Sequence, residues 1–168
     1  MQPTLILITG GTLDKDYNAI SGELGFSESH LPKIIKQANC TLALRFNQVL
    51  LKDSLEMNEQ DRHAILEAII DANESQIVIT HGTDTMSLTA EYIQKQKTQH
   101  PALEQKTIVL TGAMRPFQLG ESDASFNLGT ALMASQLQTS GIYIAMNGQC
   151  HSAEKVAKNR KLGVFEAS

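Results

Sequence analysis

The sequence predicts an α/β domain in which a largely parallel β-sheet carries helices on both faces. Short apolar runs that do not alternate with polar residues are typical of strands buried on both sides. Segments with helical spacing lie between these runs, and strands that alternate with helices form βαβ units. No linker, repeat or low-complexity tract divides the 168 residues, so we expect a single domain. The predicted strands are residues 5–8, 77–79, 108–110 and 142–145, with a weaker candidate at 42–46.

Three apolar stripes mark the predicted helices. The first follows the polar residue Asn58, the second includes Leu88 and Tyr92, and the third begins at Phe126. Right-handed crossovers between parallel strands would give a Rossmann-like or flavodoxin-like arrangement. Residues 14–29 fit neither the helical nor the strand period, and long loops of this kind often serve as lids or binding loops.

The composition is that of a globular protein, with 42% hydrophobic and 19% charged residues. A formal net charge of −4 favours neither a nucleic acid nor an anionic membrane as partner. No apolar run reaches the roughly 18 residues that span a bilayer, and no basic leader precedes the first strand. Cys40 and Cys150 match neither a metal spacing nor a disulfide framework. We therefore expect a cytoplasmic protein with two free thiols.

Three of the predicted strands end in nearly the same way. They are followed by residues 9–12 (TGGT), 80–85 (THGTDT) and 111–114 (TGAM). Because the carboxyl ends of parallel strands face one crevice, we expect these loops to converge there. Glycines let backbone N–H groups approach a ligand, and the helices that follow add positive dipole ends. The crevice therefore favours a carboxylate, a phosphate or a developing oxyanion.

Hydroxyl groups distinguish these loops, since neither glycine-rich nucleotide motif is present. Thr12 and Thr83 each follow a glycine, and Asp84 comes next. A threonine hydroxyl attacks only when a base takes its proton, and a lysine of lowered pKa can be that base. Other interpretations stay open at this point. Residues 10–11 can be a plain tight turn, Thr83 and Asp84 can be helix N-caps, and the basic segment 153–161 can be a solvated face.

The loops at residues 9–12 and 81–86 (HGTDTM) resemble the two signature motifs of the bacterial-type L-asparaginases. Two further blocks are similar to the same family and follow in the same order, so the resemblance covers nearly the whole chain. The third block comprises residues 111–116, 122–124 and 126–128, and the fourth comprises residues 145–148 and 156–159. The resemblance implies an amidohydrolase that needs no cofactor.

The resemblance also implies a role for each matched catalytic residue. Thr12 corresponds to the nucleophile that attacks the side-chain amide carbon. Thr83 and Asp84, with Lys158 of the fourth block, correspond to a second triad that transfers protons or activates water. Tyr17 is the only tyrosine in the predicted loop and is matched to the tyrosine of the family's flexible loop.

The predicted substrate contacts come from the same resemblance. Ser54 corresponds to the serine that binds the substrate's α-carboxylate, and Asp84 also meets the α-ammonium. Gly82, Thr83 and Ala113 complete the predicted substrate-binding set. Leu55 departs from the pattern, because many members of the family carry a polar side chain there.

Residues 1–168 correspond only to the N-terminal α/β domain of the family, whose full-length members are roughly twice as long. Their smaller C-terminal domain lends an acidic residue to a neighbouring subunit's site, so this chain resembles the short members that lack it. Glu56 could partly substitute, or it is an exposed acid at the start of a helix. His81 is expected to be structural, since the resemblance assigns proton transfer to lysine and tyrosine. The other histidines share no spacing, so we expect no metal site.

These observations predict hydrolysis of L-asparagine to L-aspartate and ammonia. Two alternatives remain: a glutaminase or ammonia-releasing component of an amidotransferase, and a catalytically silent module that binds amino acids. A module that only binds would not need Lys158. A homo-oligomer is expected, because an open crevice gains little from its charges and a second copy is the commonest cover.

Overall fold

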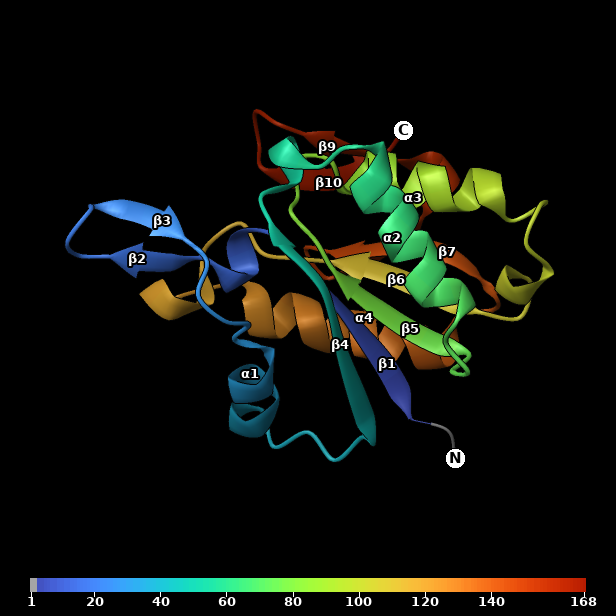
Figure 1. Cartoon of the computed structure of the whole chain (residues 1–168), viewed down its shortest axis with the longest axis horizontal. Helices are drawn as coiled ribbons and strands as arrows, with labels where there is room; N and C mark the ends of the chain where they lie inside the picture. Colours follow the sequence, from blue (N-terminus) through green and yellow to red (C-terminus); the bar gives the residue numbers. More distant parts are fainter. Residues whose placement is uncertain (1–2) are drawn as a thin grey trace.

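The computed structural model describes residues 3–168 and places six strands in one sheet (Figure 1). Five of them are parallel, and the last pairs antiparallel at one edge. Taken in chain order, the parallel strands have the spatial order 2-1-3-4-5 of flavodoxin-like sheets, as predicted. Across the sheet, the strands are β4 (Leu44–Lys52), β1 (Thr4–Gly10), β5 (Gln76–Thr80), β6 (Thr107–Thr111), β7 (Gly141–Met146) and β8 (Gln149–Ser152).

Helices cover both faces of the sheet, which gives three layers. One face packs against α2 (Glu59–Ile70) and α3 (Met86–Gln96). The other packs against α1 (Leu31–Gln37) and α4 (Ala124–Leu137). Single turns of 3-10 helix lie in the connecting loops, at Thr12–Asp14, Ser54–Glu56, Pro101–Leu103, Phe117–Leu119 and Ala153–Lys155.

The continuous apolar runs are explained by this layering. Every residue of β1 is buried, and successive side chains enter opposite cores. Leu5 and Leu7 lie in the core with α2 and α3, whereas Ile6 and Ile8 lie in the core with α4. A strand that is buried on both faces has no solvent-facing positions, so its sequence does not alternate between apolar and polar residues.

The start of α2 follows from a reciprocal cap. The Asn58 side chain accepts a hydrogen bond from the Asp61 N–H, and the Asp61 carboxylate accepts one from the Asn58 N–H. The predicted polar start at Asn58 is therefore confirmed, with two of the helix's free donors satisfied.

Two segments differ from the sequence-based expectation. The weak strand placed at 42–46 is β4, which begins at Leu44 and continues to Lys52. It lies at the sheet edge and carries polar residues such as Arg45 and Gln48, so the apolar-run criterion places it too early. Residues 14–29 contain a short hairpin of β2 (Asp16–Asn18) and β3 (Glu23–Gly25), which we call the arm.

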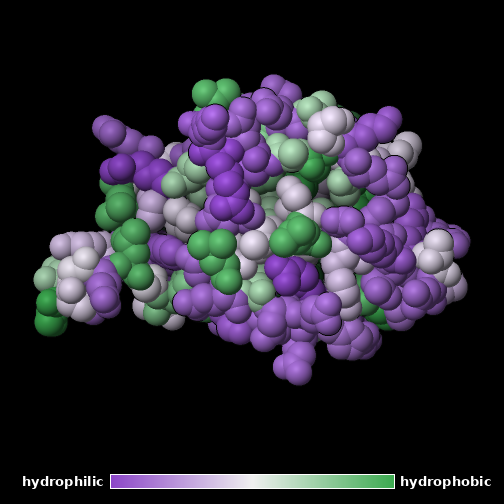
Figure 2. All heavy atoms as spheres, turned by 90° about the horizontal axis from the view of Figure 1, so that it is seen from above, coloured by the Kyte–Doolittle hydropathy of each residue, from purple (hydrophilic) through white to green (hydrophobic). Residues whose placement is uncertain are grey.

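The arm projects from the body of the molecule (Figure 1). Its apolar side chains are exposed, with Ile20 98% and Tyr17 50% accessible. Seen from above, the face is mostly hydrophilic, and several of its hydrophobic residues lie on the arm and beside it (Figure 2). The arm is held to the body at its base, where Lys15 pairs with Asp53 and the Tyr17 N–H donates to Gln118 Oε1.

The basic segment 153–161 is exposed at Lys155, Arg160 and Lys161, as in the solvated interpretation, but not at Lys158. It contains β9 (Val156–Asn159), which forms an antiparallel hairpin with β10 (Val164–Ala167). Phe165 is buried in the core and lies directly opposite Lys158. Directly opposed residues share one face of a hairpin, so burial of Phe165 turns Lys158 inward as well. The Lys158 side chain is only 11% exposed.

Among the helices in residues 3–168, none combines the length and the apolar character that a membrane span requires. Cys40 and Cys150 are free and half-buried, and burial raises the pKa of the Cys150 thiol.

The sheet reverses its strand order between β1 and β5, because β1 continues to β4 on one side while β5 starts the run on the other. In open α/β sheets, ligands bind beyond the carboxyl ends of the strands at this switch point. The loops at residues 9–12 and 80–85 therefore lie where the fold places a site.

Candidate functional site

The three strand-end loops are in direct backbone contact. A Cβ atom on Gly11 would overlap the backbone of Gly82, and one on Gly112 would overlap the carbonyl oxygen of His81. Gly11 also has a φ of 82°, which L side chains rarely adopt. The predicted convergence is therefore confirmed, and glycine is required at these positions for steric reasons.

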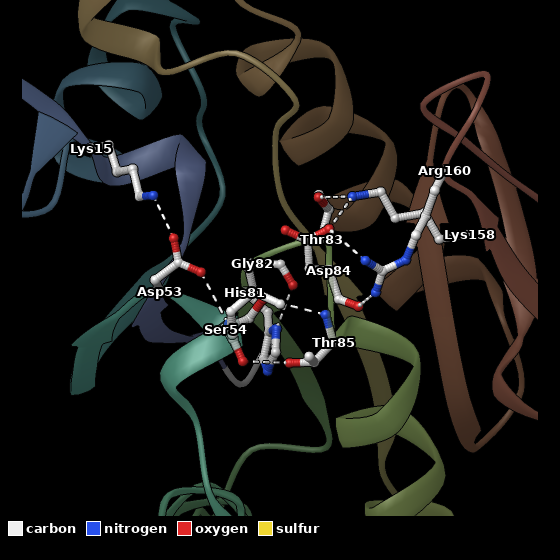
Figure 3. A network of polar contacts seen from close by, with 11 residues as sticks. Lys15, Asp53, Ser54, His81, Gly82, Thr83, Asp84, Thr85, Lys158 and Arg160 are labelled. Atoms are coloured by element: carbon white, nitrogen blue, oxygen red, sulfur yellow. Dashed lines mark hydrogen bonds and ion pairs between the residues drawn. The ribbon is translucent and has the colours of Figure 1, made fainter.

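Lys158 reaches the second loop from the C-terminal hairpin (Figure 3). Its Nζ donates to Thr83 Oγ1 at 2.8 Å and to Asp84 Oδ1 at 2.9 Å. Thr83 is 6% exposed, and the Asp84 side chain is partly open to solvent. A hydroxyl, a carboxylate and an amine thus share one hydrogen-bonded cluster, which can hold and move protons.

Arg160 adds a second cation to this cluster. Its guanidinium donates to the Asp84 carbonyl oxygen at 3.2 Å and lies 3.9 Å from Asp84 Oδ1. Lys158 takes the Oδ1 atom, while Oδ2 has no hydrogen bond to any residue in 3–168. The cluster therefore combines one acidic side chain with two basic side chains.

Thr12 begins a 3-10 turn directly after Gly10 and Gly11, and it is half-buried. Its hydroxyl makes no hydrogen bond to another described residue. The N–H groups of Thr12 and Thr83 likewise have no acceptor within residues 3–168. Buried backbone donors are rarely left unpaired, so free N–H groups in neighbouring loops indicate a place for an anionic or polar ligand atom.

Ser54 is brought to the same loops by the turn that follows β4. It is 1% exposed, and a Cβ on Gly82 would overlap its hydroxyl. The Thr85 N–H donates to Ser54 Oγ at 3.3 Å, and Thr85 Oγ1 donates to the Ser54 carbonyl at 2.8 Å. The Ser54 oxygen is thus used as an acceptor, and its own proton can be donated to a ligand.

Asp53 connects this turn to the base of the arm. Its carboxylate accepts the Leu55 N–H as the cap of the turn and forms an ion pair with Lys15 (Figure 3). The hydrogen bond from Lys15 lowers the pKa of Asp53. The chain just after Thr12 is therefore tied to the turn that holds Ser54.

His81 is completely buried and lies beneath the loop. Burial lowers its pKa to about 4, so the ring is neutral at pH 7. Its Nδ1 lies 2.8 Å from the Gly82 carbonyl, and its Nε2 lies 2.7 Å from Thr89 Oγ1. Both nitrogens are occupied, which supports the structural interpretation over the general-base interpretation.

Tyr17 is the predicted site residue that the structure does not bring to the cluster. It lies on the arm and lines a groove with Asp16, His30 and Lys33, and Thr12 is not among the groove's lining residues. Ala113, which belongs to the predicted substrate-binding set, lies in the third loop and is buried. Leu55 and Glu56 are both exposed on the turn after Ser54.

Several residues of the site were not predicted. Lys15 and Arg160 pair with acids of the site, and Asn127 ties the third loop to the turn after β7. The Asn127 amide donates to the Gly112 carbonyl at 3.0 Å and accepts the Asn147 N–H at 3.2 Å. Of these three residues, only Asn127 belongs to a block of family resemblance, at residues 126–128.

Comparison with known proteins decides the family. Residues 4–165 match the family model described as "Asparaginase, N-terminal". The chain belongs to the asparaginase family.

Two curated relatives match nearly all of the chain. It is 30% identical over 165 residues to an L-asparaginase of Thermococcus kodakarensis, covering 95% of this chain and 48% of that protein. It is 33% identical over 169 residues to a component of the glutamyl-tRNA(Gln) amidotransferase of Methanococcus vannielii, covering 94% of this chain and 38% of that protein. The chain thus spans half or less of the length of these relatives.

Solved asparaginase structures show the same fold. The thermostable L-asparaginase from Thermococcus kodakarensis superposes with a TM-score of 0.82 at 27% identity, covering 99% of this chain and 51% of that one. The probable cytoplasmic L-asparaginase from Campylobacter jejuni gives 0.80 at 26% identity, covering 99% and 52%.

No group of three or more His, Cys, Asp or Glu side chains that could hold a metal ion occurs within residues 3–168.

We predict that Gly11→Ala destabilises the protein far more than Gly22→Ala. Both glycines have positive φ, but a Cβ on Gly22 meets nothing within 4 Å. Gly22→Ala should therefore cost about 1 kcal/mol of backbone strain. Gly11→Ala adds overlap with Gly82 and should cost about 3 kcal/mol or more. Urea unfolding measures both, and equal losses would show that the two loops can separate freely.

We also predict an acid-sensitive stability that depends on His81. The folded pKa of about 4 lies below the ordinary value of 6.5, so the unfolded chain binds more protons between these pH values. Stability is then full above pH 6.5 and falls by about 3 kcal/mol as the pH drops towards 4. Unfolding free energies at pH 7 and 4.5 should differ less for His81→Asn than for the wild type. The exposed His63→Asn is the control, and an unchanged pH dependence in His81→Asn would refute the assignment.

Proposed function

We propose that this domain hydrolyses the side-chain amide of L-asparagine to L-aspartate and ammonia, with Thr12 as the nucleophile. The observation that carries the proposal is the bonding of Lys158 to both Thr83 and Asp84 at the sheet's switch point. The adjoining loop presents the Thr12 hydroxyl without a competing hydrogen bond. Membership in the asparaginase family supports the reaction class.

The proposed reaction proceeds in two steps. The Thr12 Oγ bonds to the amide carbon, its proton passes to the amide nitrogen, and the C–N bond breaks to release ammonia. This leaves an ester between Thr12 and the substrate's side-chain carboxyl carbon. Water then adds to the ester carbon, a proton returns to Thr12 Oγ, and the ester C–O bond breaks to release the acid. The cluster of Lys158, Thr83 and Asp84 is assigned to the proton transfers.

Backbone donors suit the charge that develops during both steps. Attack on the amide carbon places negative charge on the carbonyl oxygen. The N–H groups of Thr12 and Thr83 have no acceptor within the described chain and come from loops in direct contact. Fixed donors of this kind are worth about 3 kcal/mol each to the transition state.

The remaining polar groups match the two ends of an amino acid. The Ser54 hydroxyl can donate to the α-carboxylate, since its oxygen already accepts from Thr85. Asp84 can receive the α-ammonium at Oδ2, because Lys158 occupies Oδ1. The excess positive charge from Arg160 adds attraction for the carboxylate.

A second candidate is the release of ammonia from glutamine for transfer to another substrate. The relatives named as part of a glutamyl-tRNA(Gln) amidotransferase favour it, since they are as similar as the L-asparaginases. Ammonia release measured on asparagine and glutamine side by side separates the two. A silent binding module would release no ammonia from either compound.

Tyr17, Glu56, the homo-oligomer and the cytoplasmic location stay predictions. Tyr17 lines a groove beside the arm, and Thr12 is not among the residues that line it. The names of the relatives include a cytoplasmic and a periplasmic L-asparaginase, so they do not decide the location.

We predict that Thr12→Ala lowers kcat on asparagine by at least about 10³-fold, as expected when a nucleophile is deleted. Thr41→Ala, at an exposed threonine, serves as the matched control. Near-normal ammonia release by Thr12→Ala would remove Thr12 from the role of nucleophile.

We predict that Lys158→Met abolishes turnover while the fold is retained, because a thioether cannot accept or donate the proton. Lys155→Met changes an exposed lysine just before the same hairpin and should leave kcat unchanged. Circular dichroism checks the fold of both variants. Turnover that survives in Lys158→Met would mean that this amine only pairs with Asp84.

A further inference from the structure

Three hydrogen bonds connect α2 to the loop of the site through His81. Arg62 Nε donates to Thr89 Oγ1 at 3.1 Å, Thr89 Oγ1 lies 2.7 Å from His81 Nε2, and His81 Nδ1 lies 2.8 Å from the Gly82 carbonyl oxygen. Arg62 comes from α2, Thr89 from α3, and His81 directly follows β5. We call these three residues the relay.

The direction of every bond in the relay is fixed by its two ends. A guanidinium can only donate, so Thr89 Oγ1 accepts from Arg62 and is free to give its own proton to His81 Nε2. A carbonyl oxygen can only accept, so His81 Nδ1 carries the ring proton and donates it to Gly82. The two ends agree on one neutral form of the ring, with hydrogen on Nδ1. The lowered pKa of His81, to which the Arg62 charge contributes after burial, is consistent with a neutral ring.

This form of the ring determines how the Gly82–Thr83 peptide is turned. The carbonyl of a trans peptide points opposite to the N–H of the next residue, and no peptide between residues 3 and 168 is cis. Because the Gly82 carbonyl points to His81, the Thr83 N–H points away from it. The alternative ring form, with hydrogen on Nε2, would present a lone pair at Nδ1. That lone pair would attract the Thr83 N–H and favour the flipped peptide.

We propose that Arg62 and Thr89 are positioning residues that hold His81 in the Nδ1–H form, so that the Thr83 N–H stays available to the reacting amide. Neither residue reaches the substrate in this inference, which rests on the proposed amide hydrolysis. Arg62 disfavours the Nε2–H form of the ring, which goes with the flipped peptide. In that form Thr89 Oγ1 would accept hydrogen bonds from both Arg62 and His81, and the Thr89 hydroxyl proton would need another acceptor. Removing Arg62 removes this bias towards the unflipped peptide.

The test compares Arg62→Met with Arg62→Lys. Methionine keeps an unbranched stem but has no donor, whereas lysine keeps a charged donor. We expect kcat on asparagine to fall about tenfold in Arg62→Met with KM changed less than twofold, and Arg62→Lys to recover most of it. Nitrogen-15 NMR of the histidine rings should show Nδ1–H for His81 in the wild type and a growing share of Nε2–H in Arg62→Met.

Thr89→Val is the second variant, in case Arg62→Met does not fold. It removes the hydroxyl at constant shape and should also lower kcat with little change in KM. Thr130→Val makes the same change on α4, where the hydroxyl bonds only its own helix, and should leave kcat unchanged.

The NMR measurement needs no turnover, so the two proposals fail separately. A wild-type protein that shows Nδ1–H but releases no ammonia would overturn the proposed hydrolysis and leave only the ring assignment. Nε2–H in the wild type would overturn the relay, whatever the activity. An unchanged kcat in both Arg62→Met and Thr89→Val would also overturn it.

Discussion

The site depends on the direct contact of three backbone loops at the carboxyl ends of β1, β5 and β6. Where Gly11 meets Gly82, and Gly112 meets His81, no side chain separates one loop from the next. The loops therefore form a single layer of peptide groups above the sheet. A shift in one loop is transmitted to the others, because close-packed backbone has no soft side chain to absorb it. The rest of the site, including the relay and the hairpin that carries Lys158, is attached to this layer.

Much of the sheet and the meeting of its loops could be predicted from local patterns. The inner strands are apolar on both faces and end in glycine and threonine, so composition alone marks them. The edge strand β4 was misplaced because one side of it meets no neighbouring strand. The hairpin of β9 and β10 was not predicted, because its strands have four residues each and show neither a continuous apolar run nor a regular alternation. Lys158 was identified by family resemblance, since its local sequence is that of a solvated basic segment.

The unpredicted parts of the site are polar contacts between distant segments. Arg62 with Thr89, Lys15 with Asp53, and Arg160 with Asp84 join different elements. Such pairs leave no period in the sequence, and one charged residue on a helix looks like any other until the fold places its partner. Tyr17 shows the opposite case. A residue matched by sequence lies on the arm, apart from the cluster it was assigned to.

The hairpin of β9 and β10 has a consequence for the order in which the protein is made. Thr12 leaves the ribosome early, and the strands from β1 to β7 can pair before the hairpin has emerged. The Lys158 amine takes its position only when the hairpin has folded and Phe165 is buried in the core, after the strands of the sheet have been synthesised. A nascent chain could therefore close its sheet and bind ligand groups at Ser54 while still lacking the group assigned to proton transfer. Catalytic competence would then arrive after the binding site has formed.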